Sequence, residues 1–457
     1  MKHLFYIRTM ILSTVFFLIS VFSCNNVTAQ VESFLLKDTS VNLVTNSKIR
    51  YVNDSVALGY YQTSQKGYFL VIDLYNASII SKVYLDSNYL FINDYHILND
   101  TVYACGTFLE PPVWNGVILT FNINDIVQND SKPTAFSDWT KIDNTTSLNR
   151  MVVYKNDYAS GNIELVAIGY KEVIEGQYSS KYGRIVDFKS PSPGSATYKV
   201  RERYYSNTES ESYDDIVLTE NYIGIIGSVG NNTTSIRKTP RNCQDLLSGM
   251  IDTIYVYSYN HIEPASRQHA TEAGGDRMQM ATYAVNSNGQ YRTHIRPFNL
   301  QNMSMQSGYD ISMNNKSEPE EITYNGLLNS FFLLERLHLT NSPLLLEHQV
   351  VTQLPGGIIG QLSYYIAGQG FSSISTLSSN SCFLLAGGSM FAQKSISNNS
   401  QNSCFSTSTI MGIKVGAVTH SIIHDPTQAI SNYGIWQNCL LFQDSLHVVK
   451  ICLNNQQ

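Results

Sequence analysis

The sequence is poor in charged residues and lacks the short motifs of several common enzyme classes. Only 14% of the 457 residues are Asp, Glu, Lys or Arg, against about 25% in an average globular domain. Basic residues are outnumbered by acidic ones, 30 to 36, for a net charge of −6. With this acidic balance, a basic face for nucleic acid or an anionic membrane is not expected. No G-x-S-x-G, H-E-x-x-H or P-loop sequence occurs, so no ready-made hydrolase, metalloprotease or nucleotide site is indicated.

The N-terminal apolar run is too short to cross a membrane. It covers Met10 to Phe22, 13 residues, whereas a spanning helix needs about 20. Lys2 and Arg8 precede it, which is the arrangement of an export signal. We therefore expect the protein to leave the cytoplasm for the periplasm or the cell surface.

Two processing sites fit this signal, and both stay open. Val27-Thr28-Ala29 predicts an export signal of residues 1–29, removed before Gln30. Ser20-Val21-Phe22-Ser23-Cys24 resembles a lipobox, which predicts a lipoprotein signal of residues 1–23 and acylation of Cys24. Acylated Cys24 would be the only membrane attachment.

Cysteine usage excludes a cysteine metal site and permits disulfides. No C-x-x-C occurs among the seven cysteines, and their spacing matches no zinc site. We expect no metal and no cofactor. Cys24 is lost or acylated in either processing route, and the other six lie in an oxidising compartment. Two local disulfides are plausible, Cys439 with Cys452 and Cys382 with Cys404. Cys105 would then pair with Cys243, or Cys105 and Cys382 are buried free thiols.

The sequence is rich in strand and turn formers. Its polarity comes from Asn, Ser, Thr and 30 Tyr, which suit strands and turns better than helices. A unit of a turn residue, an apolar strand and a glycine recurs, and a second strand often follows. The closing glycines are Gly59, Gly106, Gly169, Gly227 and Gly387. The glycine at a fixed strand position indicates a bulge or a close backbone approach.

This repeat predicts an all-β chain folded as a β-propeller. Three or four short antiparallel strands fill each unit, close to the size of a propeller blade. The central strands are apolar at consecutive positions, as expected for sheets covered on both faces. We expect one domain over residues 30–457, with seven blades or, as an alternative, eight. Residues 32–44 should join the C-terminal strands around Cys439 to Cys452 in one blade. Two β-sandwich domains are the competing fold.

The turn–strand–glycine units resemble those of exported, lipoprotein-type β-propeller proteins of Gram-negative gut bacteria. The resemblance implies a fold and a compartment, and no activity. Four Asp-Ser/Thr-aliphatic sequences also resemble an O-glycosylation motif of exported proteins in one group of such bacteria, although the same residues close turns before strands. The candidate acceptors are Ser55, Thr101, Thr253 and Ser445.

Ionisable residues gather in the least repetitive region, which we interpret as a polar insertion around residues 228–279. Arg237, Lys238 and Arg241 are predicted to share one loop, and a second group follows, with His261, Arg267 and His269. Clustered charge in a charge-poor chain, on a long loop, suggests a ligand site. The alternative is a solvated insertion that needs charge only to stay soluble. Trp114, in the expected turn Glu110–Asn115, is a further candidate contact residue.

The sequence favours a non-enzymatic binding or scaffold module of the cell envelope, with a protein or glycan partner. A carbohydrate-active enzyme, a hydrolase or lyase, is the alternative, because acids on separate blades cannot be recognised from one sequence. Glu335 and Asp276 are the candidate acids for that alternative.

The mature N-terminus decides between the two processing sites. Intact-mass analysis of protein from the native envelope should show either a chain beginning at Gln30 or a chain beginning at Cys24 with added lipid mass. Retention of Met1 would contradict both. A mass above that of the bare polypeptide, after lipid is accounted for, would support glycosylation.

Overall fold

The computed structural model describes residues 34–452 except for breaks at 128–138, 157–161, 190–196, 204–210, 242–254, 259–267, 286–290, 311–315, 339–346, 356–361, 376–382, 394–403 and 415–432, and shorter ones of up to four residues. Side chains are described only within residues 47–335.

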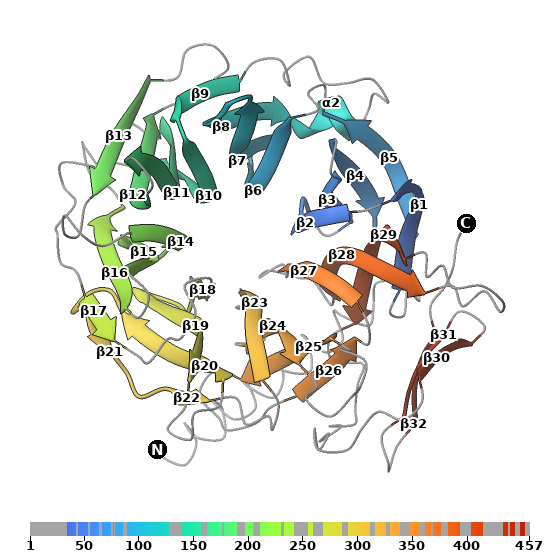
Figure 1. Ribbon diagram of the computed structural model, residues 1–457. Coiled ribbons are helices and arrows are strands. Elements are labelled where there is room, and N and C mark those ends of the chain that lie inside the picture. Colours follow the sequence, from blue (N-terminus) through green and yellow to red (C-terminus); the bar gives the residue numbers. More distant parts are fainter. Residues whose placement is uncertain are drawn as a thin grey trace, which may run out of the picture.

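The described strands form antiparallel sheets arranged around a ring (Figure 1). Seven of these sheets contain four or five strands. The first three are β2–β5 (Val44–Tyr51, Val56–Thr63, Gly67–Asp73, Ser78–Tyr84), β6–β9 (Leu90–Leu98, Thr101–Glu110, Val113–Asn122, Trp139–Asn144) and β10–β13 (Thr146–Asn156, Asn162–Glu175, Tyr178–Lys189, Thr197–Arg203). The short helix α2 (Ile123–Val127) follows β8.

The ring continues with three more sheets in chain order. They are β14–β17 (Glu211–Leu218, Tyr222–Val229, Thr233–Pro240, Tyr255–Ser258), β18–β22 (Gln268–Glu272, Arg277–Val285, Tyr291–Asn299, Ser304–Met305, Tyr309–Asp310) and β23–β26 (Lys316–Asn325, Ser330–His338, Glu347–Pro355, Leu362–Ile366). In each, the first strand lies nearest the centre (Figure 1). The predicted β-propeller is therefore confirmed and the two β-sandwich domains are not found. The blade number of the whole chain stays a prediction.

An N-terminal strand completes the last sheet of the ring. β27 (Gln369–Ser375), β28 (Phe383–Gln393) and β29 (Cys404–Lys414) are followed outward by β1 (Phe34–Asn42). β1 pairs with β29 in antiparallel register, with Phe34 opposite Gly412 and Leu36 opposite Ile410. The ring is thus closed by joining strands from the two ends of the chain, as expected.

The partner of the N-terminal strand differs from the expected one. The final strands, β30 (Tyr433–Trp436), β31 (Cys439–Gln443) and β32 (Val448–Cys452), form a separate three-stranded sheet, drawn outside the ring in Figure 1. The prediction that residues 32–44 join these strands was wrong. The strand Cys404–Lys414, which lies earlier in the chain, pairs with the N-terminal strand instead.

Apolar side chains fill the spaces between neighbouring sheets. One buried cluster brings together Leu58 and Phe69 of the first sheet with Tyr95 and Val102 of the second, and similar clusters follow around the described part of the ring. Burying each large apolar side chain stabilises the fold by roughly 1.5–3 kcal/mol. β4 is buried at its first six positions, which explains why the central strands are apolar at consecutive residues.

The repeated glycine lies against a bulge in the innermost strand. Four innermost strands shift register at the same place, between Ile92/Asp94, Leu148/Arg150, Tyr213/Asp215 and Pro319/Glu321. The residues opposite the start of the first three bulges are Gly106, Gly169 and Gly227. A Cβ at these positions would overlap a backbone carbonyl oxygen, that of Phe91, Ser147 and Ser212 respectively. The close approach anticipated from the sequence is therefore real.

The region interpreted as a polar insertion contains blade strands. Within residues 228–279 the described segments are the end of β15, the strands β16, β17 and β18, and the start of β19. Residues 242–254 and 259–267 lie outside the described part of the chain. Among the described residues, no helix is long and apolar enough to span a membrane.

The bulge contact predicts a position-specific stability effect. Gly169→Ala should lower the free energy of unfolding by about 3 kcal/mol, because overpacking against a fixed backbone atom is relieved only by moving two strands. Gly116→Ala is the control, since its new Cβ would meet only side-chain carbons at 3.0–3.3 Å. Urea unfolding followed by tyrosine fluorescence measures both. Equal losses in the two variants would contradict the assigned role of the bulge.

The register of β31 and β32 supports one of the predicted disulfides. Cys439 and Cys452 are directly opposite each other in antiparallel pairing, where Cα atoms lie about 4.5–5.5 Å apart, within disulfide reach. Non-reducing peptide mapping of exported protein should recover a Cys439–Cys452 cross-link; two free thiols would contradict it. Cys105 is buried and free, in line with the free-thiol alternative, and Cys243 and Cys382 lie outside the described residues.

Candidate functional site: the axial cluster

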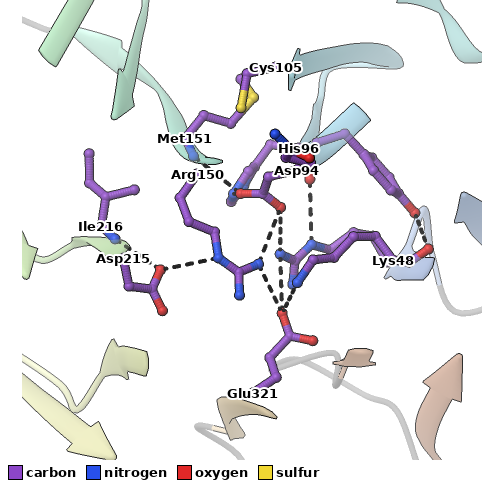
Figure 2. Close-up of polar contacts among 12 residues, drawn as sticks. Lys48, Asp94, His96, Cys105, Arg150, Met151, Asp215, Ile216 and Glu321 are labelled. Atoms are coloured by element: carbon purple, nitrogen blue, oxygen red, sulfur yellow. Dashed lines mark hydrogen bonds and ion pairs between the residues drawn. The ribbon is translucent and has the colours of Figure 1, made fainter. Parts of the chain in front are cut away.

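Charged side chains from the innermost strands of different sheets meet at the centre of the ring (Figure 2). We call this group the axial cluster; its members are Lys48, Arg50, Asp94, His96, Arg150, Asp215, His269 and Glu321. They come from β2, β6, β10, β14, β18 and β23. Three of them, Asp94, Arg150 and Asp215, directly follow a bulge opposite a repeated glycine. Glu321 follows the corresponding bulge of the sixth sheet.

Glu321 is the point where the cations of two strands converge. Its Oε1 lies 2.9 Å from Lys48 Nζ, 3.5 Å from Arg150 Nη1 and 3.8 Å from Arg50 Nη2. Burial alone would raise the pKa of Glu321, but Lys48, Arg50 and Arg150 together hold it well below its ordinary value. Glu321 is therefore ionised near neutral pH.

Asp94 links the second sheet to both of its neighbours. Its Oδ1 lies 3.1 Å from Arg50 Nη2 and 4.0 Å from Arg150 Nη1. Its Oδ2 accepts the backbone N–H of Met151 at 3.2 Å. Burial would raise the pKa of Asp94, but the positive charge of Arg50 above all, with Arg150 and the neighbouring His96, holds it below the usual range.

Asp215 repeats this arrangement two sheets further on. Its Oδ2 accepts the backbone N–H of Ala270, in the next sheet, at 3.0 Å. Arg150 Nε lies 3.8 Å from Oδ1 and His269 Nδ1 lies 3.7 Å from Oδ2. Burial again opposes ionisation, and Arg150 and His269 outweigh it, so the pKa of Asp215 is lowered.

The axial cluster is electrically balanced near neutral pH. Burial lowers the pKa of His269, and partial burial with the nearby charges of Arg50 and Arg150 lowers that of His96, so both imidazoles are neutral near pH 7. The remaining members are three cations and three carboxylates. Such groups are costly to desolvate, and only their mutual pairing makes the burial tolerable.

Polar side chains in the bulges donate hydrogen bonds to the backbone of the next sheet. Asn93 Nδ2 donates to the carbonyl of Leu148 at 2.8 Å, and Asn149 Nδ2 donates to the carbonyl of Tyr213 at 3.3 Å. Together with the bonds to Asp94 and Asp215, these contacts hold the sheets at a fixed spacing around the axis.

Asp214, in the bulge of β14, has an unusual acidity. It is half-buried, and its Oδ2 accepts a hydrogen bond from Ser228 Oγ at 2.8 Å. Burial, with a further contribution from the charge of Asp215, raises the pKa of Asp214 to about 7. It is the kind of carboxyl that can donate or accept a proton near neutral pH.

The predicted basic loop is not a loop. Arg237 and Lys238 lie in β16, where Arg237 pairs with the buried Glu211 through Nε at 3.1 Å. Lys238 Nζ donates to the carbonyls of Leu300 and Gln301 at 2.8 and 2.9 Å. The prediction that Arg237 and Lys238 share a loop was therefore wrong. Both cations make contacts within and between sheets, and their role in ligand binding stays a prediction.

The other predicted site residues are dispersed. Arg241 follows β16; its Nη1 donates to the carbonyl of Thr219 at 3.4 Å and its guanidinium lies over Tyr154. His269 lies in the axial cluster, the one predicted residue that the structure brings there. His261 and Arg267 lie outside the described residues.

Trp114 is the second residue of β8 and is half-buried. The expected turn Glu110–Asn115 was wrong, since only Pro111 and Pro112 lie between β7 and β8.

Asp276 and Glu335, the acids suggested for an enzyme, lie at positions where they contribute to the packing of the sheets. Asp276 accepts hydrogen bonds from the side chain and backbone N–H of Asn221, both at 2.9 Å, and so joins two sheets. Glu335 is fully buried in β24, opposite Pro319, at the position where other sheets carry glycine.

The modification sites remain predictions. Ser55 Oγ donates to Asn53 Oδ1 at 2.8 Å, and the same oxygen accepts the N–H of Val56 at 3.0 Å, as expected for a turn that precedes a strand. Thr101 occupies the corresponding place at the start of β7. Thr253, Ser445, Cys24 and the export signal lie outside the described residues.

Most residues of the axial cluster were not predicted from the sequence, although the sequence contains a pattern that marks them. Two adjacent polar residues precede an apolar one near the start of each strand concerned: Asn93-Asp94-Tyr95, Asn149-Arg150-Met151, Asp214-Asp215-Ile216, Gln268-His269-Ala270 and Glu320-Glu321-Ile322. In the part of the chain with described side chains, no group of three or more His, Cys, Asp or Glu residues is placed to hold a metal ion.

No protein-family model and no curated protein matches this chain. Solved structures are similar at low identity. Raptor from Chaetomium thermophilum is 9% identical with a TM-score of 0.44, covering 84% of this chain and 28% of its own. The β-propeller domain of the Trilobed protease from Pyrococcus furiosus is 6% identical at 0.43, covering 84% and 98%. Kuenenia stuttgartiensis hydrazine synthase is 11% identical at 0.48, covering 83% and 99%. The chain thus spans little more than a quarter of Raptor, and these likenesses concern the fold alone.

Removing the charge of Glu321 should destabilise the ring. Glu321→Gln leaves three buried cations with two carboxylates, so the free energy of unfolding should fall by about 3 kcal/mol at pH 7. Glu110→Gln is the matched control, because Glu110 is 55% exposed in its pair with Lys141 and exposed pairs contribute little. Urea unfolding at pH 7 measures both variants.

The same variant should show a defined pH dependence. The pKa of Glu321 is depressed on folding, so its contribution is complete above the unfolded value of about 4.3 and is lost as the pH falls below it. The stability difference between wild type and Glu321→Gln should therefore be constant from pH 6 to 8 and shrink below about pH 4. A difference independent of pH down to 3 would contradict the ion-pair role.

Proposed function

We propose that this protein is an exported β-propeller of the cell envelope that acts as a non-enzymatic binding or scaffold module, and that a protein is its principal partner. The N-terminal signal supports export. The repeat scaffold, with its sheets tied at the axis, supports a rigid platform. One surface feature supports partner binding.

The large exposed apolar side chains of the described residues come from one short stretch of the chain. Where side chains are described, the large exposed ones are Ile80, Tyr84 and Tyr89, at 45%, 38% and 51%. Isolated exposed apolar residues are ordinary, but a contiguous group marks an interaction site. Tyrosine is also enriched in protein interfaces. All three lie within ten residues, on β5 and the segment leading to β6, and we call them the β5 strip.

The strand geometry explains why the β5 strip faces outward. β5 is the outermost strand of its sheet, and alternate residues point to opposite faces. Ser81 and Val83 are buried, and Ser81 Oγ donates to the carbonyl of Ile126 in α2 at 3.2 Å. Tyr84 therefore projects on the other face, beside Lys82, whose Nζ lies 5.1 Å from the Tyr84 ring centroid. Ile80 is the extra residue of a bulge, since Ser81 pairs with Val71 and Ile79 with Ile72, and its side chain is exposed. The strip combines apolar, aromatic and cationic contacts.

An affinity pull-down from the native envelope fraction tests this proposal. Tagged wild-type protein should recover a stoichiometric partner, and the double variant Ile80→Ser/Tyr89→Ser should lose at least about 90% of it, as expected when central apolar contacts are removed. Lys141→Gln, a change at a side chain 44% exposed on β9, should retain it. Thermal unfolding should be unchanged in both, since the altered residues are exposed. No partner with wild type, or equal recovery with the double variant, would overturn the assignment.

A carbohydrate-active enzyme is the second candidate, and Asp214 is the observation that favours it. A carboxyl with a pKa of about 7 is suited to general acid catalysis. Turnover of a glycan panel by purified protein, abolished in Asp214→Asn, would support this candidate. Absence of turnover over pH 5–8 would leave the binding module.

A further inference from the structure

Three consecutive bulges carry an extra polar residue at the same position, and the third differs in its chemistry. In the second sheet Asn93 Nδ2 donates to the carbonyl of Leu148, in the next sheet. In the third sheet Asn149 Nδ2 donates likewise to the carbonyl of Tyr213. The fourth sheet carries Asp214 there. An ionised carboxyl only accepts hydrogen bonds, whereas a protonated one donates as well as accepts, like a carboxamide. Only the protonated form of Asp214 therefore matches the two asparagines.

Asp214 lies at the contact between the fourth and fifth sheets. Its Oδ2 accepts from Ser228 Oγ at 2.8 Å, and this hydroxyl oxygen accepts from Gln268 Nε2 at 3.1 Å. Gln268 belongs to β18 of the fifth sheet. The neighbouring Asp215 accepts the backbone N–H of Ala270, also in β18, at 3.0 Å. We call these contacts the β14–β18 junction. Two carboxyl groups adjacent in sequence hold it together.

Ionisation of Asp214 places a second negative charge in this junction. Asp215 is already ionised near neutral pH, because Arg150 and His269 outweigh its burial. Burial and the charge of Asp215 both oppose the ionised form of Asp214. Two hydroxyls and one cation favour it, those of Ser212, Ser228 and Lys181. Lys181, in β12, is exposed, so water and salt screen its charge. Burial and like charge prevail, and the pKa of Asp214 is raised to about 7.

We infer that Asp214 is a pH-sensitive switch in the ring: when protonated it holds the fourth sheet to the fifth, and when ionised it loosens the β14–β18 junction. The ring is therefore tighter at this point in weak acid than at neutral pH. The switch goes beyond the proposed binding function, because it involves none of the residues of the β5 strip.

The direction of the effect follows from the protons bound in the closed and the open junction. The pKa of Asp214 lies above the value of about 3.9 for an exposed aspartate, so opening releases a proton between about pH 4 and 7. Opening is thus favoured as the pH rises through this range and changes no further above it. His269 acts in the opposite direction. Burial lowers the pKa of His269, so an open junction lets it take up a proton below about pH 6.5. Comparing two variants at the same pH cancels this second effect.

Hydrogen–deuterium exchange of a peptide containing β18 tests the switch. The exchange rates of the full-length wild type and of Asp214→Asn are compared at pH 5 and at pH 8. Asparagine stays neutral at both, so the ratio of the wild-type rate to the variant rate should be at least about tenfold larger at pH 8. A peptide containing β3 and β4, in the first sheet, should show no such change.

Asp100→Asn is the matched control variant. Asp100 is exposed in the turn before β7, at a φ of 58° that asparagine also adopts. Its exchange ratio for the β18 peptide should be the same at both pH values. If Asp214→Asn does not fold, NMR of the wild type provides the readout. The side-chain carboxyl carbon of Asp214 and the backbone amide of Ala270 should then titrate together, with a midpoint at the Asp214 pKa of about 7.

The outcomes either support or overturn the switch. An exchange ratio that is equal at both pH values, a ratio that falls as the pH rises, or an Ala270 signal without a transition at the midpoint of Asp214 would overturn it. None of these results affects capture of a protein partner by the β5 strip. Conversely, loss of the partner in Ile80→Ser/Tyr89→Ser leaves the exchange of β18 unchanged, so the two proposals fail separately.

Discussion

Arg150 is the group on which the centre of this propeller depends. It extends from the third sheet and lies within 4.0 Å of carboxylates from the second, fourth and sixth sheets. No apolar contact could link sheets across the axis in this way, because neighbouring blades pack only against each other. A buried guanidinium is tolerated only when surrounded by opposite charge, so Arg150 requires Asp94, Asp215 and Glu321 as much as they require it.

The repeated glycines allow the bulges that place the charged residues of the axial cluster. Gly106, Gly169 and Gly227 leave room for a bulge in the strand nearest the axis. The bulge adds one residue, so that two consecutive polar residues can be accommodated where a regular strand would turn the second away. The first ties its sheet to the next through a backbone group, as Asn93 and Asn149 do. The second enters the axial cluster.

This arrangement separates the parts of the molecule that hold it together from those available to partners. The basic residues of β16 are paired within and between sheets, and Asp276 joins two sheets. What remains is an outer apolar strip on the first sheet and the partly exposed side of the axial cluster, marked by Arg50 and His96.

The sequence by itself determined the fold class and the strand pattern. Recurring turn–strand–glycine units and apolar central strands are local properties, and covered sheets of short strands leave few solutions other than a propeller. The bulge could also be predicted from the sequence, because only a glycine, which has no Cβ, allows the backbone of the neighbouring strand to come so close.

Only the tertiary structure decided which residues form the site. Lys48 and Glu321 are 273 positions apart, and no local pattern says that they meet at 2.9 Å. From the sequence, Arg237 and Lys238 were expected in a solvated loop, because charged residues are usually exposed. Their burial is possible because Arg237 pairs with Glu211 and Lys238 donates to the carbonyls of Leu300 and Gln301. The N-terminal strand likewise could pair with any apolar strand near the C-terminus, and only ring closure selected β29. Pairing between distant residues is set by the closed ring, which a linear pattern does not contain.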